Sequence, residues 1–269
     1  MHLAKLLVQP GSKLDLSVHD PRDLAGAPPD KPTRLRKLSE ISAEIEALQD
    51  KLYAGQRHKV LIVLQGMDTA GKDGTIRHVF SAVNPLAVRA KGFRAPAGEE
   101  ISYDYLWRVH RQVPRRGEIV IFNRSHYEDV LVVRVNGLID ASECARRLRQ
   151  IREFERMLAE TGTTIVKFFL NISREEQGRR LQNRIDDPAK QWKFDPTDLE
   201  ARSHWNDYMD AYTTALAETS ASWAPWYVIP SDSKSTRNLL VSAVLRDQLS
   251  ALHLEYPQSK LDFKFFRIE

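Results

Sequence analysis

The chain of 269 residues has little cysteine, little net charge and no long apolar run. Its single cysteine, Cys144, excludes an internal disulfide framework and a cysteine-based zinc cluster, and it agrees with a reducing compartment. No apolar segment approaches the roughly 20 residues that a membrane-spanning helix needs. The apolar start at residues 1–8 is interrupted by Lys5 and is too weak for a secretory signal. We therefore expect a cytoplasmic protein that does not associate with membranes.

The overall amino-acid composition favours one large folded domain. Hydrophobic residues make up 42% of the chain and charged residues 28%, a balance that allows a packed core and argues against wholesale disorder. The net charge is only +4, so a binding site for a polyanion has to come from local clustering of basic residues.

Proline content and periodicity divide the chain into an arm, a body and a tail. Residues 1–33 hold five of the 13 prolines, and we expect an extended N-terminal arm there, a body over 34–257 and a C-terminal tail over 258–269. The body opens with a helix from an N-cap at Thr33 to a stop at Gly55. One apolar face of this helix recurs at steps of three and four, through Leu35, Leu38, Ile41, Ile45, Leu48 and Leu52.

Expected strands and helices alternate along the body. The continuous apolar runs at 60–64, 118–122, 164–170 and 226–229 predict buried parallel strands, and 72–83, 141–160 and 236–252 are expected helices. This order predicts a three-layer α/β/α fold with a central parallel sheet. The charged segment 184–200, broken by two prolines, indicates a helical lid over about 178–205.

The most informative motif is G-x-x-x-x-G-K, which is matched by Gly66, Gly71 and Lys72 directly after an expected strand and before an expected helix. Glycines let the backbone turn its N–H groups inward, and the helix points its positive end at a phosphate. We predict a phosphate loop whose binding residues are Gly66, Thr69, Ala70, Gly71, Lys72, Asp73 and Gly74.

Carboxylates stand where phosphate loops usually carry a hydroxyl. Asp73 takes the place of the Ser or Thr that holds Mg²⁺, and Asp68 lies inside the loop. Because carboxylates and phosphates repel unless a cation stands between them, the loop predicts Mg²⁺, with Mn²⁺ as an alternative, bridged by carboxylates. After the second strand, Asp129 reaches this metal if 125–133 is helical. Arg124 stands at the carboxyl end of that strand, where ligands of parallel sheets bind.

Basic residues gather in two regions, one around Arg89, Lys91 and Arg94 and one before and within the expected lid. Together they predict a channel for a polyanion, and Arg184 is placed to close on a transferring phosphate. Nucleic acid is a competing ligand for basic and aromatic residues, but the net charge is low and no recognition motif is present.

The sequence resembles the family-2 polyphosphate kinases over about residues 30–257. The resemblance rests on GMDTAGKD at 66–73, RAP at 94–96 followed by two glutamates at 99 and 100, LWRVH at 106–110, and above all IFNRSHYEDVLVVRV at 121–135. It implies Mg²⁺-dependent transfer of phosphoryl groups between polyphosphate and adenine or guanine nucleotides. It also implies a homo-oligomer, either a dimer or a tetramer.

The resemblance further implies roles for individual residues. Asp68 and Asp129 are expected to place the metal, and Lys72 with its loop to hold the nucleotide phosphates. Arg124 and the lid residue Arg184 are expected to stabilise the transferring group. The expected polyphosphate ligands are Arg89, Lys91, Arg94, Arg134, Arg180 and Lys193. Asn123 and the run 127–129 resemble the subgroup that accepts both AMP and ADP.

Two other functions stay open on the residues alone. An ATP-dependent kinase of a nucleoside monophosphate or small metabolite would share the loop and lid but need less basic surface. A nucleic-acid-binding phosphate-loop protein would use the same basic residues on a different ligand.

Overall fold

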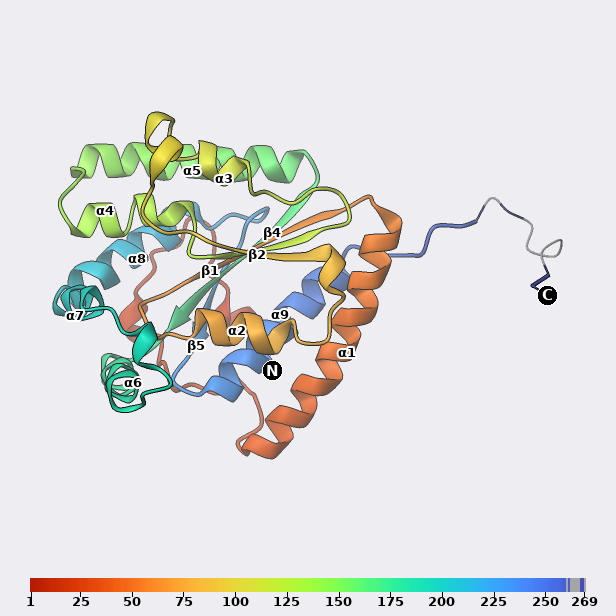
Figure 1. The fold of residues 1–269 in the computed structure, drawn as a ribbon, viewed down its shortest axis with the longest axis horizontal. Coiled ribbons are helices and arrows are strands. Elements are labelled where there is room, and N and C mark those ends of the chain that lie inside the picture. Colours follow the sequence, from red (N-terminus) through yellow and green to blue (C-terminus); the bar gives the residue numbers. More distant parts are fainter. Residues whose placement is uncertain (260, 262–266, 269) are drawn as a thin grey trace.

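One parallel sheet with strand order β2-β3-β1-β4-β5 forms the centre of the computed structural model, which describes residues 1–259, 261, 267 and 268 (Figure 1). The strands are β1 Lys59–Gln65, β2 Val88–Gly92, β3 Ile119–Asn123, β4 Thr163–Asn171 and β5 Trp226–Pro230. The predicted parallel sheet and its four buried strands are therefore confirmed. The expected tail over 258–269 lies largely outside the described residues.

Helices cover both faces of the sheet (Figure 1). One layer holds α1 Lys31–Gly55, α2 Lys72–Val79 and α9 Lys234–Ser250, and the other holds α3 Trp107–His110, α4 Val132–Val135, α5 Ala141–Glu160 and α8 Trp205–Thr219. The helices α6 Arg174–Asp186 and α7 Thr197–Ser203 lie at one end of the molecule. This arrangement confirms the predicted three-layer α/β/α fold. In the described part of the chain, no helix is both long enough and apolar enough to cross a membrane.

The first helix starts earlier than the sequence predicts. Asp30 is its N-cap, because Asp30 Oδ1 accepts a hydrogen bond from the Thr33 backbone N–H at 2.8 Å. The predicted N-cap at Thr33 is therefore wrong, whereas the predicted end at Gly55 is confirmed. The helix expected over 72–83 ends at Val79, and the helix considered over 125–133 is replaced by a 3₁₀ turn at His126–Asp129 followed by α4.

The edge strand β2 was not predicted from the sequence. Its residues include Arg89 and Lys91, and the basic character of the segment hid its extended conformation. Charged side chains on an edge strand discourage pairing with another chain, which explains why this strand lacks the apolar run of its neighbours.

The N-terminal residues cover the opposite edge of the sheet. Leu7 forms an antiparallel bridge with Tyr227, and the Val8 backbone N–H donates to Trp226 O at 2.9 Å. Leu6, Val8 and Leu16 are buried in the core. Residues 1–30 thereby protect β5, and Arg22 of this segment pairs with Glu175 at the start of α6.

A buried polar network joins β4 to the helix layer that contains α5 and α8. Lys167 Nζ donates to Glu155 Oε2 at 2.5 Å, to the Tyr127 hydroxyl at 2.9 Å and to Thr219 O at 2.9 Å. Lys167 is 0% exposed and Glu155 1%. Burial would raise the pKa of Glu155, but the charge of Lys167 and the hydrogen bonds to His126 and Lys167 together outweigh it and lower that pKa below its ordinary value. Through Tyr127 the network fixes the turn that follows β3.

The chain leaves β1 through Gly66, which crosses the carboxyl end of β4. Gly66 has φ +147°, and a Cβ placed there would lie 2.7 Å from Leu170 O. Because the close neighbour is backbone, it cannot move aside as a flexible side chain would. Only glycine fits this crossing without strain.

We expect Gly66→Ala to lower the free energy of unfolding by about 1–3 kcal/mol, since the added methyl meets Leu170 O and the positive φ strains alanine. Urea unfolding measures this change. Gly92→Ala is the matched control, because nothing lies within 4 Å of a Cβ there and its φ is ordinary. Equal stability of the two variants would contradict the argument.

We expect Lys167→Met to lower the free energy of unfolding by about 3–5 kcal/mol, since it leaves the Glu155 carboxylate buried without its cation. The double variant Lys167→Met, Glu155→Gln should recover part of the loss. The lowered pKa of Glu155 means that its stabilising contribution is present above the ordinary pKa of 4.5 and is lost as the pH falls through the folded-state value. Urea unfolding between pH 7 and pH 3 should show a larger loss of stability in the wild type than in the double variant.

Candidate functional site

The loop between β1 and α2 lies at the carboxyl end of the sheet, where β1 is flanked by β3 and β4. Thr69 has φ +64° and Gly71, the N-cap of α2, has φ +108°, so the backbone curls tightly before the helix. Thr69 Oγ1 is buried and has no hydrogen-bond partner among the described residues. Such a curl in front of a helix N-terminus presents N–H groups to an anion.

Lys72 reaches back into this loop. Its side chain is 8% exposed, and Nζ donates to Gly66 O at 2.7 Å and to Met67 O at 3.3 Å. Burial and the neighbouring charge of Arg124 lower the pKa of Lys72, and the charge of Asp68 only partly opposes them. A bound anion would favour the charged ammonium at this position.

Arg124 links Asp68 of the loop to Glu128, which follows β3. Its Nη2 donates to Asp68 Oδ1 at 2.5 Å, and its Nη1 donates to Glu128 Oε2 at 3.0 Å. The residue adopts φ +61°, an uncommon conformation for arginine, directly after β3. Burial alone would raise the pKa of Asp68, but the charges of Lys72 and Arg124 hold it below its usual range.

Two further contacts position the start of α2 and the turn after β3. Asn123 Nδ2 donates to Asp73 Oδ1 at 2.6 Å, which ties the helix to the end of β3. Asp129 is buried and lies 3.5 Å from Arg108 Nη2 and 4.0 Å from Arg147 Nη1. Burial raises the pKa of Asp129 although both arginines oppose it. Asp129 is thus held by arginines of neighbouring segments rather than by the loop.

The 178–205 segment contacts the loop through an acid that the sequence analysis missed. Asp198 Oδ2 accepts from Arg184 Nη1 at 2.9 Å, and Arg184 Nη1 also donates to Lys193 O at 3.1 Å. Burial and the charge of the adjacent Asp68 raise the pKa of Asp198 to about 6. Nothing in the sequence around Asp198 identifies it as a site residue. Its partner Asp68 is distant along the chain, and only folding brings the two carboxylates close together.

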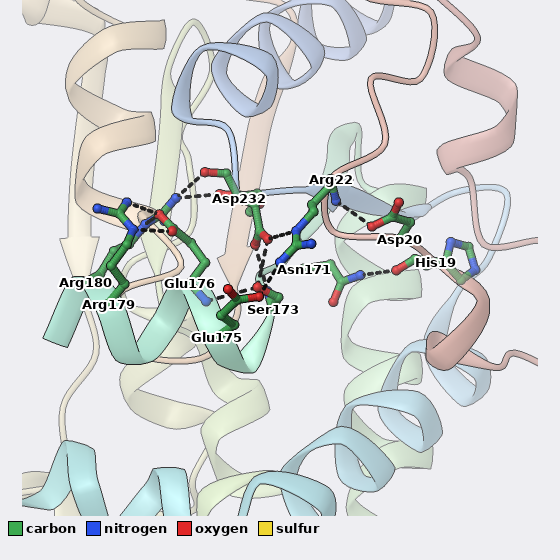
Figure 2. A network of polar contacts seen from close by, with 11 residues as sticks. His19, Asp20, Arg22, Asn171, Ser173, Glu175, Glu176, Arg179, Arg180 and Asp232 are labelled. Atoms are coloured by element: carbon green, nitrogen blue, oxygen red, sulfur yellow. Dashed lines mark hydrogen bonds and ion pairs between the residues drawn. The ribbon is translucent and has the colours of Figure 1, made fainter. Parts of the chain in front are cut away.

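Arg180 lies behind the loop. Its Nη1 donates to Thr69 O at 2.9 Å. Its Nη2 donates to Asp232 O at 2.7 Å and its Nε donates to Glu176 Oε1 at 2.7 Å (Figure 2). Arg237 of α9, also missed by the sequence analysis, donates from Nη1 to Ala70 O at 3.0 Å. Its position just after β5, at the carboxyl edge of the sheet, was the available signal.

The structure does not gather all six residues expected to bind polyphosphate. Arg89 is bound to Glu118 and Gln112 near the amino ends of β2 and β3, away from the loop. Lys91 and Arg94 lie at the carboxyl end of β2, and exposed Arg134 lies on α4. Lys193 Nζ lies 4.9 Å from the centre of the Trp192 ring. Of the six, Arg180 is the one with a hydrogen bond to the loop among the described residues.

The acids of the site suit a hard divalent cation in their donor chemistry, since Asp68 and Asp129 supply carboxylate oxygens. Over residues 1–259, 261, 267 and 268, however, no three His, Cys, Asp or Glu side chains are grouped as metal ligands. A Mg²⁺ ion at this site therefore needs ligands from phosphate oxygens and water in addition to the protein.

Comparison with known proteins agrees with this geometry. The sequence model described as "Polyphosphate kinase 2 (PPK2)" matches residues 29–257. A relative from Meiothermus ruber, named AMP/ADP-polyphosphate phosphotransferase, is 53% identical over 256 residues, which cover 95% of this chain and 96% of that protein. A relative from Rhodopseudomonas palustris, named ADP-polyphosphate phosphotransferase, is 45% identical and covers 84% of this chain and 80% of that protein.

A solved structure extends the agreement to three dimensions. The crystal structure of polyphosphate kinase 2 from Arthrobacter aurescens TC1 matches with a TM-score of 0.92 and 44% identity, over 96% of this chain and 92% of that chain. Sequence, fold and loop geometry thus lead to one conclusion: the chain belongs to the polyphosphate kinase 2 family.

Proposed function

We propose that the chain transfers phosphoryl groups between inorganic polyphosphate and nucleotides, converting AMP to ADP and ADP to ATP in a reversible reaction. The observation that carries this proposal is the phosphate loop with Lys72 inside it and Arg124 beside it. Membership of the polyphosphate kinase 2 family and the printed names of its relatives support the substrate pair.

The nucleotide phosphates occupy the loop over residues 66–74. The positive end of α2 and the Lys72 ammonium bind them, and Arg124 turns from Asp68 towards the group in transfer. A terminal phosphate oxygen of AMP or ADP attacks the terminal phosphorus of polyphosphate in line, and the bond to the next bridging oxygen breaks. One phosphoanhydride replaces another, so catalysis consists of positioning and charge stabilisation, and concentrations set the direction.

Mg²⁺, with Mn²⁺ as the alternative, would be held by Asp68 and Asp129 and would neutralise charge on the phosphates when bound. Arg124 keeps Asp68 ionised in the free protein, so the carboxylate is ready to accept a cation in place of the guanidinium. Arg108 and Arg147 favour the ionised form of Asp129, but burial outweighs them and raises the pKa of that carboxyl.

Segment 178–205 acts as a lid in this proposal. Arg184 and Asp198 bring it to Asp68 of the loop, and the Lys193 carbonyl accepts from Arg184 within the segment. Lys91, Arg94 and Lys193 then bind the polyphosphate chain, whereas Arg89 remains paired with Glu118 and Arg134 lies apart on α4. Arg180 contributes from behind the loop.

Acceptance of both AMP and ADP, and of guanine as well as adenine nucleotides, is part of the proposal. Asn123 and the run 127–129 support the first, together with the name of the Meiothermus ruber relative. A relative from Mycobacterium tuberculosis named GDP-polyphosphate phosphotransferase, 35% identical, supports the second. The cytoplasmic location and the homo-oligomeric state, a dimer or a tetramer, stay predictions.

The direct test is phosphorus NMR of the purified protein with polyphosphate, MgCl₂ and either ADP or AMP. We expect ATP from ADP, and ADP followed by ATP from AMP, with no product when EDTA replaces MgCl₂.

ATP plus AMP without polyphosphate tests the ATP-dependent kinase alternative. Steeply salt-dependent retention of duplex or single-stranded DNA would favour the nucleic-acid alternative. Absence of ATP from ADP and polyphosphate would refute the proposal.

We expect Lys72→Ala to reduce kcat by on the order of 10²–10³-fold, because the ammonium stabilises charge that develops on the transferring group. Its control is Lys37→Ala, an exposed lysine on α1 that leaves the loop untouched. Steady-state kinetics with ADP and polyphosphate measure the change, and thermal unfolding checks that both variants are folded. A folded Lys72→Ala enzyme with near-normal kcat would rule out this role.

A further inference from the structure

The first turn of α9 places a buried arginine against the outside of the phosphate loop. Arg237 is 2% exposed; its Nη1 donates to Ala70 O at 3.0 Å, and its Nε and Nη2 donate to Asn238 Oδ1 at 3.1 and 2.9 Å. A Cβ on Gly71 would lie 1.8 Å from Arg237 Nη1, and one on Gly74 would lie 3.3 Å from Nη2. The guanidinium thus fills space that side chains at these two glycines would need.

The contact with Ala70 O fixes the orientation of the next amide. In a trans peptide the C=O and the N–H point in opposite directions. Ala70 O accepts from Arg237 Nη1 and, at 3.3 Å, from Arg180 Nη1, so the carbonyl is held on the outer side of the loop. The Gly71 N–H therefore points to the opposite side, into the loop, and it has no hydrogen-bond acceptor in the described part of the chain. An inward, unpaired N–H is what an anion site requires.

Arg237 also differs in charge balance from the other arginines at the loop. Arg124 pairs with Asp68 and Glu128, and Arg180 pairs with Glu176. Across the described residues, no carboxylate lies within 4.0 Å of Arg237. Burial and the charge of Arg180 lower its pKa to about 9. A buried cation without a counter-charge lowers the stability of the free protein, and an anion on the far side of the Ala70–Gly71 peptide offsets that cost.

We propose that Arg237 is a positioning residue for the nucleotide phosphates, one that turns the Gly71 N–H towards them and supplies a fixed positive charge whose counter-charge is the bound anion. Arg237 acts through the peptide and does not touch the ligand. The inference rests on the proposed function, since it takes the loop as the phosphate site. It adds that the free protein carries an unbalanced charge, so ligand binding and folding stability are coupled at this residue.

The test compares Arg237→Met and Arg237→Lys with the wild type. Isothermal titration with ADP in MgCl₂ gives Kd, and thermal unfolding with and without ADP gives Tm. For Arg237→Met we expect the Kd for ADP to rise by about tenfold or more, because the variant loses the positive charge and the hydrogen bond that orients the Gly71 N–H. The rise in Tm that ADP causes should become smaller. The Tm of the free Met variant should stay near that of the wild type or exceed it. Arg237→Lys keeps the positive charge but lacks the planar guanidinium with its several N–H donors, so its Kd for ADP should lie between those of the wild type and Arg237→Met.

The matched control is Arg246→Met on the same helix, whose arginine pairs with Glu44 and Asp247 away from the loop. We expect it to bind ADP as the wild type does. A merely structural role for Arg237 predicts the reverse pattern, in which the Tm of the free variant falls and Kd is unchanged, and that pattern would overturn the inference. If Arg237→Met does not fold, Arg237→Lys decides: weaker ADP binding at wild-type Tm supports the inference, and unchanged binding overturns it.

The two proposals fail in different ways. A wild-type protein that makes ATP from ADP and polyphosphate, with variants at Arg237 that bind ADP normally, leaves the proposed function standing and removes the inference. A wild-type protein that neither binds ADP nor makes ATP removes both.

Discussion

The site depends on the orientation of a few peptide groups after β1. An anion can be bound by backbone N–H groups only if the matching carbonyls are satisfied elsewhere, because buried carbonyls without donors are costly. Here cations supply those donors: Lys72 to Gly66 O, Arg180 to Thr69 O and Arg237 to Ala70 O. The positive charges therefore do two things at once, since they hold the loop in shape and set the potential inside it.

Acids near the loop balance part of the positive charge of these cations. Arg124 is neutralised by Asp68 and Glu128, and the charges of Lys72 and Arg124 hold the pKa of Asp68 low until a phosphate or a metal displaces the guanidinium. Asp198 meets Asp68 from the 178–205 segment, and the repulsion between the two carboxylates is the reason for the raised pKa of Asp198 beyond burial. Of the arginines that contact the loop in the described part of the chain, Arg124 and Arg180 pair with acids and Arg237 does not.

The sequence predicted the parallel sheet, the loop and the helix layers because these depend on local patterns: apolar runs, glycine spacing and periodicity. It placed the N-cap of α1 three residues late, since Asp30 and Thr33 are both good N-cap residues and the choice depends on how the arm enters. It missed β2 because a charged edge strand lacks an apolar run. Asp198 and Arg237 were missed for a different reason. Each acquires its role from a partner distant along the chain, and no spacing rule connects them.

The arm and the start of α6 meet behind the loop at Asp232. Asp232, just after β5, accepts from Ser173 N and Oγ at 2.8 Å, binds Arg22 of the arm, and offers its carbonyl to Arg180 (Figure 2). Arg22 also pairs with Glu175 on α6. If α6 moved, Arg180 would move with it and disturb its hydrogen bond to Thr69 O. The contacts of Arg22 with Glu175 and Asp232 oppose such a movement from outside the sheet. Residues 1–30 consequently belong to the support of the loop, although none of them lies in it.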